Sequence, residues 1–254
     1  MFISPVAITI FGWDIYWYAL AYSFSLLFIY WRSTILLNSL NFTYINNITK
    51  KDIDIDNFLF FAGFGMIIGG KIGYLFYDFK ISYIFNPYGF AFFGGFIGVI
   101  TACLLFTQIY NLNFRGLLLY LDITLSYLPI GIGLVRITNF INQECIGLPV
   151  EDLFWSVQLS NEDFYRYPTQ IYEAITEGLI LFYILLFIRS YFNTIIKYPG
   201  IITVTFLKIY SIFRFIIEFY KDNVFSNEIY INQLGCGMVF LFGSILFLLI
   251  KYLK

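Results

Sequence analysis

The sequence predicts an all-α polytopic membrane protein with about seven transmembrane helices. Three observations carry this prediction: 60% of the 254 residues are hydrophobic, only 12% are charged, and apolar runs recur along the whole chain. A soluble domain typically has about a quarter of its residues charged. We therefore expect a single integral membrane domain over residues 1–254.

The expected helices follow from the length that a membrane requires. About 20 mainly apolar residues cross the hydrocarbon core of a bilayer as a helix. Seven segments meet this requirement, at residues 14–36, 58–77, within 81–114, 117–135, 170–188, 200–219 and 233–250. The third follows a loop at Asn86-Pro87, and residues 38–57 predict a polar surface arm. The long polar stretch Thr138–Pro168 predicts a small external cap between the fourth and fifth helices.

Basic residues in the loops predict the orientation of the chain. Cytoplasmic loops carry an excess of Lys and Arg. If the N-terminus is outside, the internal segments contain eight basic residues: Arg32, Lys50, Lys51, Arg115, Arg189, Lys197, Lys251 and Lys254. The external segments contain three: Lys80, Arg166 and Lys221. We therefore expect the N-terminus outside, the C-terminus inside, and the cap on the outer face.

Charge and cysteine content exclude several classes of function. The net charge of −1 gives no broad basic surface for nucleic acid. The three cysteines are scattered, which argues against a disulfide framework. Because the chain has no histidine, a Cys/His metal site is also excluded.

Arg136 ends the fourth predicted helix, and polar residues follow it directly. The stretch Gly131–Gly147 reads GIGLVRITNFINQECIG and adds Thr138, Asn139, Asn142, Gln143 and Glu144. A guanidinium can bind a phosphate or carboxylate through paired hydrogen bonds. An arginine at a helix end can also simply extend to the lipid–water boundary, but the polar residues beside Arg136 favour function.

Charged residues also occur inside the predicted helices, where they are costly and often functional. Arg214 and Glu218 lie four residues apart on one helical face. One interpretation is an internal ion pair that neutralises both charges. The other is that Glu218 orients a functional Arg214, and the two interpretations are compatible. For Asp122 we expect a structural partner, Lys71 or Lys208, or a hydrogen-bonded neutral form.

Two glycine clusters predict close contact between helices. They are Gly69-Gly70 with Gly73 and Gly94-Gly95 with Gly98. Small residues let helix backbones approach closely in a membrane. The alternative interpretation is that these glycines open room for a lipid chain.

Five stretches resemble, in order, the motifs of the prolipoprotein diacylglyceryl transferase family. They are Tyr16–Tyr22 (YWYALAY), Gly69–Asp78 (GGKIGYLFYD), Arg136–Gly147 (RITNFINQECIG), Arg166–Glu173 (RYPTQIYE) and Phe213–Glu218 (FRFIIE). The chain departs from the family pattern at two histidines, which are Phe93 and Tyr167 here. Further departures are Lys71 for arginine, Thr138 for glycine and Leu148 for arginine.

The resemblance implies an enzyme of the bacterial plasma (inner) membrane with its site toward the outer leaflet. Such an enzyme moves the diacylglyceryl group of phosphatidylglycerol onto the lipobox cysteine thiol of a preprolipoprotein, and it releases glycerol phosphate. Its partners are phosphatidylglycerol, the preprolipoprotein signal peptide and membrane lipids, and no metal or organic cofactor is implied.

The resemblance and the chemistry together give the candidate site residues. We expect catalysis from Arg136, Arg214 and Glu144. We expect substrate binding from Arg136, Asn139, Asn142, Gly147, Tyr18, Tyr74, Gly94, Gly95 and Glu218. Phe93 cannot accept a proton, so Glu144, Tyr167 or the leaving phosphate must do so, or cations alone activate the thiol.

Two alternatives to an active transferase remain. The first is a catalytically inactive homologue that binds lipid or lipoprotein, because the family's histidine is absent. The second is a small-solute transporter with Arg136 and Arg214 in its pathway. The five ordered motifs and the single cap favour the transferase.

Overall fold

The computed structural model describes residues 4–40, 55–78, 92–160, 162–192, 195, 198–222 and 226–252. The chain divides into two compact units, one formed by Met1–Trp31 with Asp122–Lys254 and the other by Arg32–Leu121. The predicted loop at Asn86-Pro87 and most of the predicted arm at residues 38–57 lie outside the described residues.

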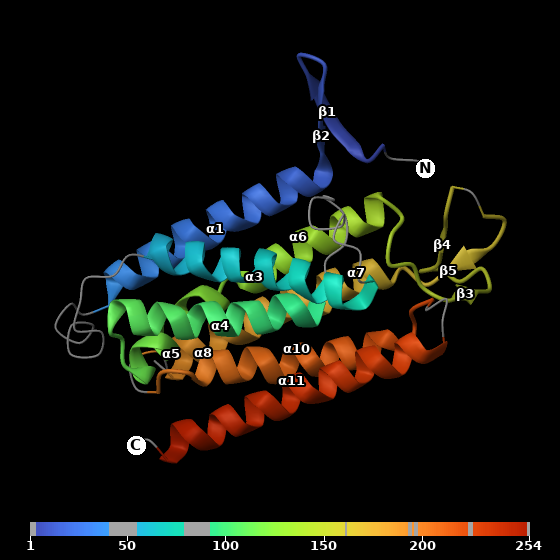
Figure 1. The fold of residues 1–254 in the computed structure, drawn as a ribbon. Coiled ribbons are helices and arrows are strands. Elements are labelled where there is room, and N and C mark those ends of the chain that lie inside the picture. Colours follow the sequence, from blue (N-terminus) through green and yellow to red (C-terminus); the bar gives the residue numbers. More distant parts are fainter. Residues whose placement is uncertain are drawn as a thin grey trace. The chain divides into compact units, whose positions relative to one another are not determined.

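Helices make up most of both units (Figure 1). The first unit contains the start of α1 (Trp17–Ser39), then α6 (Leu128–Ile141), α7 (Thr169–Glu173), the π-helix η2 (Ala174–Ile180), α8 (Leu181–Phe192), α10 (Ile201–Glu218) and α11 (Ser226–Tyr252). The second contains the rest of α1, α3 (Ile55–Asp78), α4 (Phe92–Tyr110) and most of α5 (Phe114–Leu125). Within the first unit, α10 and α11 lie side by side.

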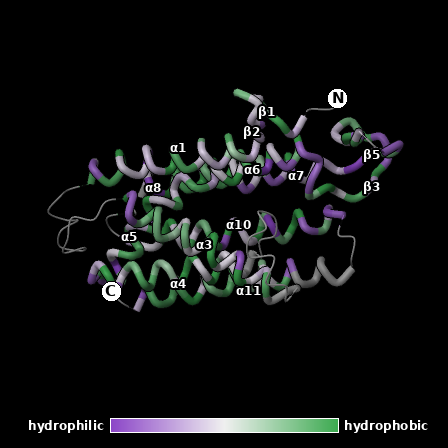
Figure 2. Tube along the Cα trace, turned by 45° about the horizontal axis from the view of Figure 1, so that its top comes forward, coloured by the Kyte–Doolittle hydropathy of each residue, from purple (hydrophilic) through white to green (hydrophobic). Residues whose placement is uncertain are grey.

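Four described helices are long and apolar enough to cross a membrane. They are Trp17–Ser39, Ile55–Leu75, Thr169–Tyr191 and Asn232–Tyr252, and the pair α5 and α6 makes a fifth if it counts as one span. The described apolar part of α4 is shorter, and α10 carries Lys208, Arg214 and Glu218. Figure 2 shows hydrophobic residues along the helices and hydrophilic residues gathered around β5 and α7. The chain is a mostly helical integral membrane protein, while seven spans and the orientation stay predictions.

The fourth predicted helix, at residues 117–135, consists of two helices in the structure. The helices α5 and α6 meet at an angle of 43°. Pro129 stands at the start of α6 and lacks the N–H that would continue the preceding helix. The helix α6 then continues to Ile141, so Arg136 lies within a helix and not at its end.

Asp122 stabilises the N-terminus of α10. Its carboxylate accepts hydrogen bonds from the backbone N–H of Gly200 (2.7 Å) and from the N–H and hydroxyl of Thr203 (2.8 and 2.7 Å). The first N–H groups of a helix have no partner within the helix, and a carboxylate there also interacts favourably with the helix dipole. Asp122 therefore takes the amides of α10 as partners, and not the expected Lys71 or Lys208.

Short strands contradict the prediction of an all-α protein. The strands β1 (Val6–Ile10) and β2 (Trp13–Tyr16) form an antiparallel hairpin. The first helix consequently starts at Trp17, after the predicted start at Asp14. In the predicted cap, β3 (Pro149–Val150), β5 (Tyr165–Arg166) and β4 (Val157–Gln158) form a three-stranded sheet. These pairings satisfy backbone groups that no helix satisfies.

The glycine clusters pack α3 against α4, as predicted. A Cβ atom on Gly69 would lie 2.3 Å from the carbonyl oxygen of Gly94. A Cβ atom on Gly98 would lie 2.0 Å from the carbonyl oxygen of Gly65. Only glycine allows these two backbones to approach so closely.

Candidate functional site

Two buried glutamates lie where α6 approaches η2. The Cβ atom that Gly178 lacks would lie 2.8 Å from the Cα atom of Gly133, so the two backbones touch. Glu173 ends α7 and Glu177 lies in η2, and the side chains of both are fully buried. A π-helical turn inside a longer helix often occurs at a functional site. The close approach brings Arg136, one turn after Gly133, to these carboxylates.

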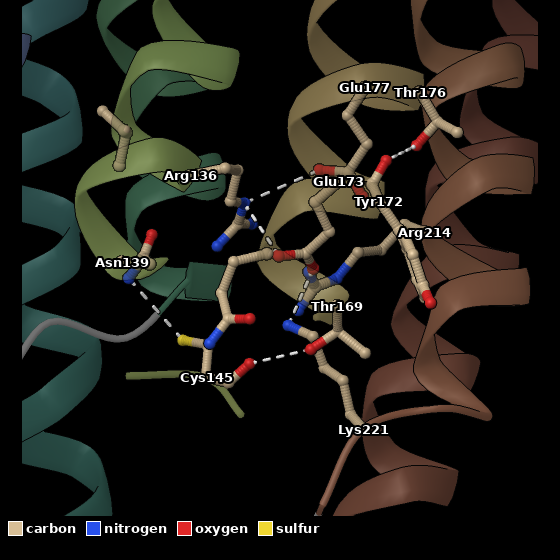
Figure 3. Close-up of polar contacts among 12 residues, drawn as sticks. Arg136, Asn139, Cys145, Thr169, Tyr172, Glu173, Thr176, Glu177, Arg214 and Lys221 are labelled. Atoms are coloured by element: carbon tan, nitrogen blue, oxygen red, sulfur yellow. Dashed lines mark hydrogen bonds and ion pairs between the residues drawn. The ribbon is translucent and has the colours of Figure 1, made fainter. Parts of the chain in front are cut away.

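Three cations contact the single carboxylate of Glu173 (Figure 3). The Nε atom of Arg136 lies 3.2 Å from Glu173 Oε2 and 3.8 Å from Glu177 Oε2. The Nη1 atom of Arg214 donates to Glu173 Oε1, and the Nζ atom of Lys221 lies 2.7 Å from the same oxygen. Side chains from α6, α10 and the segment after α10 therefore meet at one buried acid.

Glu218 supports Arg214 from the next turn of α10. The Nη2 atom of Arg214 lies 3.5 Å from Glu218 Oε2, so the expected ion pair is present. The side-chain amide of Asn232 in α11 donates to the other oxygen of Glu218 at 2.7 Å. The pair therefore belongs to a wider network that orients the guanidinium of Arg214.

Exposure differs sharply between the acids and the arginines. The side chains of Glu173, Glu177 and Glu218 are 0% exposed, whereas those of Arg136 and Arg214 are 18% and 20% exposed. The carboxylates are therefore completely covered, whereas each arginine side chain keeps part of its surface accessible. A guanidinium has five N–H donors, so each arginine has donors beyond its ion pairs. The arrangement can bind an anion such as a phosphate.

A chain of hydrogen bonds links α1 to the segment after α6. The hydroxyl of Tyr18 donates to Glu144 Oε2 at 2.5 Å and accepts from the side-chain amide of Asn139 at 2.6 Å. A Cβ atom on Gly131 would lie 3.0 Å from the Cβ atom of Ser25, so α1 and α6 pack closely about two turns away. The helix contact holds Tyr18 beside Asn139, and the hydrogen bond from Tyr18 orients the carboxylate of Glu144.

The turn after α6 has an unusual backbone. Gln143 and Cys145 have φ angles of 57° and 55°, a left-handed conformation that costs energy in a residue other than glycine. The Nδ2 atom of Asn139 lies 3.8 Å from the exposed thiol of Cys145. Within the described part of the chain, the buried Oδ1 atoms of Asn139 and Asn142 accept no hydrogen bond. Strained backbone and unused acceptors are typical of a binding site.

Arg166 connects the predicted cap to the end of α10. Its Nε and Nη2 atoms pair with Glu162 at 2.5 and 2.8 Å, and its Nη1 atom contacts Asp222 Oδ2 at 2.5 Å and the carbonyl of Gly147 at 2.8 Å. The Arg166 guanidinium lowers the pKa of the Glu162 carboxyl. A Cβ atom on Gly147 would lie 2.2 Å from the carbonyl oxygen of Tyr167, so only glycine fits there.

The structure brings most of the predicted site residues into the first unit. Arg136, Arg214 and Glu218 share the carboxylate network, while Tyr18, Asn139 and Glu144 share the hydrogen-bond chain. Asn142 and Gly147 lie in the turn that follows. Tyr74, Gly94 and Gly95 belong to the second unit, and Gly94 packs against α3 there. The roles of all these residues stay predictions.

Sequence reasoning missed three members of the network. Glu173, Glu177 and Lys221 were not among the predicted site residues, although Glu173 ends the RYPTQIYE motif. Glu173 and Glu177 lie four residues apart inside an apolar predicted helix, where a carboxylate is costly. The presence of two carboxylates in an apolar segment was the signal that would have identified Glu173 and Glu177. Lys221 gave no such signal, because it lies in a short segment between two predicted helices.

Comparison with known proteins assigns the family. The family model for prolipoprotein diacylglyceryl transferase matches residues 5–249. Proteins from Brucella canis, Brucella ovis and Brucella abortus, each named phosphatidylglycerol–prolipoprotein diacylglyceryl transferase, are 35% identical over 232 residues. Each match covers 87% of this chain and 80% of the relative. The chain is therefore a transferase and belongs to the prolipoprotein diacylglyceryl transferase family.

Proposed function

We propose that this transferase moves the diacylglyceryl group of phosphatidylglycerol onto the thiol of a lipobox cysteine in a preprolipoprotein. A thioether forms, and glycerol phosphate leaves. The names of the relatives support the two substrates. The donor is a membrane lipid and the acceptor cysteine follows a hydrophobic signal peptide, which suits an integral membrane protein.

The observation that carries the proposal is that two partly exposed arginines contact one fully buried acid. The reaction breaks a carbon–oxygen bond, and negative charge develops on the departing phosphate. Cationic donors fixed at that position lower the barrier, because they stabilise the charge without reorganising. Arg136 and Arg214 are fixed by Glu173 and Glu218. Both arginines therefore bind the phosphate of the donor and of the leaving group.

The hydrogen-bond chain beside the arginines has a different task in this proposal. Asn139, Asn142 and Glu144 bind the glycerol hydroxyl groups and position the thiol, and Tyr18 holds Glu144 in place. Gly147 keeps the turn close to the cap. On the second unit, Tyr74, Gly94 and Gly95 contact the lipid.

We further propose that the site opens toward the outer leaflet of the bacterial plasma membrane, with the N-terminus outside and the C-terminus inside. The distribution of basic residues, eight in internal and three in external segments, supports this orientation. The acceptor cysteine follows a signal peptide and reaches the enzyme from that side.

A reconstituted assay tests the proposal. The purified protein is placed in phosphatidylglycerol vesicles with a lipobox peptide, and mass spectrometry measures the mass gain of the peptide. We expect one diacylglyceryl group on the cysteine. A peptide with serine in place of that cysteine and vesicles of phosphatidylcholine alone are the controls. Absence of product under conditions in which a histidine-containing relative is active would favour the inactive lipid-binding homologue.

A further inference from the structure

The proposed reaction needs a group that accepts the proton of the thiol, and this chain lacks the residue that usually does so. A cysteine thiol has a pKa of about 8.5 and reacts as the thiolate. Histidine is the side chain that most often removes such a proton near neutral pH. The chain contains no histidine. A side chain that accepts the proton in this chain is therefore not a histidine, and the groups near the two arginines are the candidates.

Lys221 is a buried amine at the centre of the charge network. Its side chain is 6% exposed, and its Nζ atom lies 2.7 Å from Glu173 Oε1. Arg214 donates to the same oxygen. Two cationic groups on one oxygen repel each other, and of the two only the lysine can release its proton at ordinary pH. Lysine commonly acts as a base when it is desolvated beside another cation.

Charged groups from four neighbouring elements act on Lys221. They are Arg136 from α6, Glu173 from α7, Glu177 from η2, and Arg214 and Glu218 from α10. Burial, Arg214 and Arg136 lower the pKa of the Lys221 amine to about 7. A neutral amine keeps two N–H donors and gains a lone pair. It can therefore still donate to Glu173 while its lone pair accepts a proton.

The backbone holds Lys221 against the turn that contains the candidate site residues. Lys221 pairs with Gly147 in an isolated antiparallel bridge. On either side of it, the N–H of Leu148 donates to the carbonyl of Tyr220 (2.8 Å), and the N–H of Asp222 donates to the carbonyl of Ile146 (3.0 Å). The position of Lys221 relative to Glu144 and Cys145 is thus fixed by backbone pairing.

We propose that Lys221 is the general base of this enzyme and takes the proton from the acceptor thiol. The inference rests on the proposed function. The S–H proton moves to the Nζ lone pair and gives an ammonium group. The sulfur forms a bond to the glycerol carbon of the donor, the carbon–oxygen bond breaks, and its electron pair leaves with the phosphate beside Arg136 and Arg214. The ammonium returns its proton to water after product release.

Replacing Lys221 with arginine separates charge from basicity. Lys221→Arg keeps a cation beside Glu173 but cannot release a proton. We expect kcat at pH 7 to fall at least about 100-fold, the size of a general-base contribution, while KM for phosphatidylglycerol changes less than about threefold. Lys208→Arg is the matched control on α10, because Lys208 lies over the Phe240 ring and outside the network. We expect it to keep wild-type rates.

The pH profile distinguishes a base from a structural cation. For the wild type, kcat/KM should rise with pH through about 7, as the amine loses its proton. In Lys221→Arg the rise should move to about pH 8.5, where the thiol ionises unaided, and the deficit should shrink to less than about tenfold at pH 9.5. Lys221→His should recover activity with a rise near pH 6.5, and it keeps the test valid if the arginine variant does not fold.

The outcomes are decisive in each direction. An arginine variant with wild-type kcat and an unchanged profile overturns the role of Lys221 but leaves the proposed function standing. An equal loss at every pH, with no recovery by histidine, assigns Lys221 a structural role and also overturns the inference. Absence of transfer by the wild-type protein removes the proposed function and this inference together.

Discussion

Replacing Glu173 with glutamine perturbs the contact on which the candidate site depends. The carboxylate of Glu173 contacts Arg136, Arg214 and Lys221, and its side chain is fully buried. Glutamine has nearly the same shape but no charge. The substitution therefore leaves three cations close together without the acid that they share.

The magnitude follows from the distances. At an effective dielectric constant of about 20, the Lys221–Glu173 contact of 2.7 Å gives a gross attraction of about 6 kcal/mol, and the Arg136–Glu173 contact of 3.2 Å gives about 5 kcal/mol. Desolvation offsets most of this gross attraction. Removing one partner of a buried pair typically costs about 3–5 kcal/mol, because the remaining charge stays buried and unpaired. We expect Glu173→Gln to lose about that much stability.

The transfer activity of Glu173→Gln should also fall, because Arg136 and Arg214 lose the carboxylate that fixes their positions. If about 3 kcal/mol of transition-state stabilisation depends on their fixed positions, kcat/KM falls about 100-fold. Thermal unfolding in detergent measures the stability, and the vesicle assay measures transfer. Glu151→Gln is the matched control, because Glu151 is an exposed acid in the predicted cap. A Glu173→Gln variant as stable and active as Glu151→Gln would refute the charge network as the basis of the site.

The remaining predictions address single contacts. Arg136→Ala should abolish transfer while the protein still inserts in the membrane, and full activity would remove Arg136 from the site. Gly178→Ala should lower the unfolding temperature, because its Cβ atom would meet Gly133 at 2.8 Å and overpacking typically costs about 1–3 kcal/mol. Asp122→Ala should destabilise the start of α10 by about 1–2 kcal/mol, measured by hydrogen exchange at those amides. Phe93→His should retain or raise transfer, and a loss would show that the site has adapted to the aromatic ring.

The sequence predicted most helices and three members of the charge network, Arg136, Arg214 and Glu218, because both leave strong local patterns. Apolar runs gave α1, α3 and α10 to within three residues at each end, and the run at residues 170–188 covers α7, η2 and the first part of α8. The pair Arg214 and Glu218 followed from helical spacing alone. The position of the break between α5 and α6 was not predicted, because an apolar run looks the same whether the helix is straight or bent.

The central acid was harder to predict, because its partners are distant in sequence. Arg214 and Glu173 are 41 residues apart, and helical spacing does not reveal which helices pack together. The close approach of Gly133 and Gly178 decides that contact. The short strands were missed for a related reason. A strand of two residues, such as β5, has no measurable period, and only its pairing with β3 and β4 defines it.

The buried charges also bear on whether a chain without histidine is an active enzyme. An unpaired carboxylate in an apolar interior is strongly destabilising, and replacing a buried ion network with apolar residues is often neutral or stabilising. Phosphate binding by Arg136 and Arg214 would offset this cost, both in an enzyme and in a homologue that only binds lipid. Four ion pairs link these two arginines to Glu173, Glu177 and Glu218. In the proposed reaction these charges serve the phosphate leaving group, and the proton acceptor is the part that this chain supplies differently.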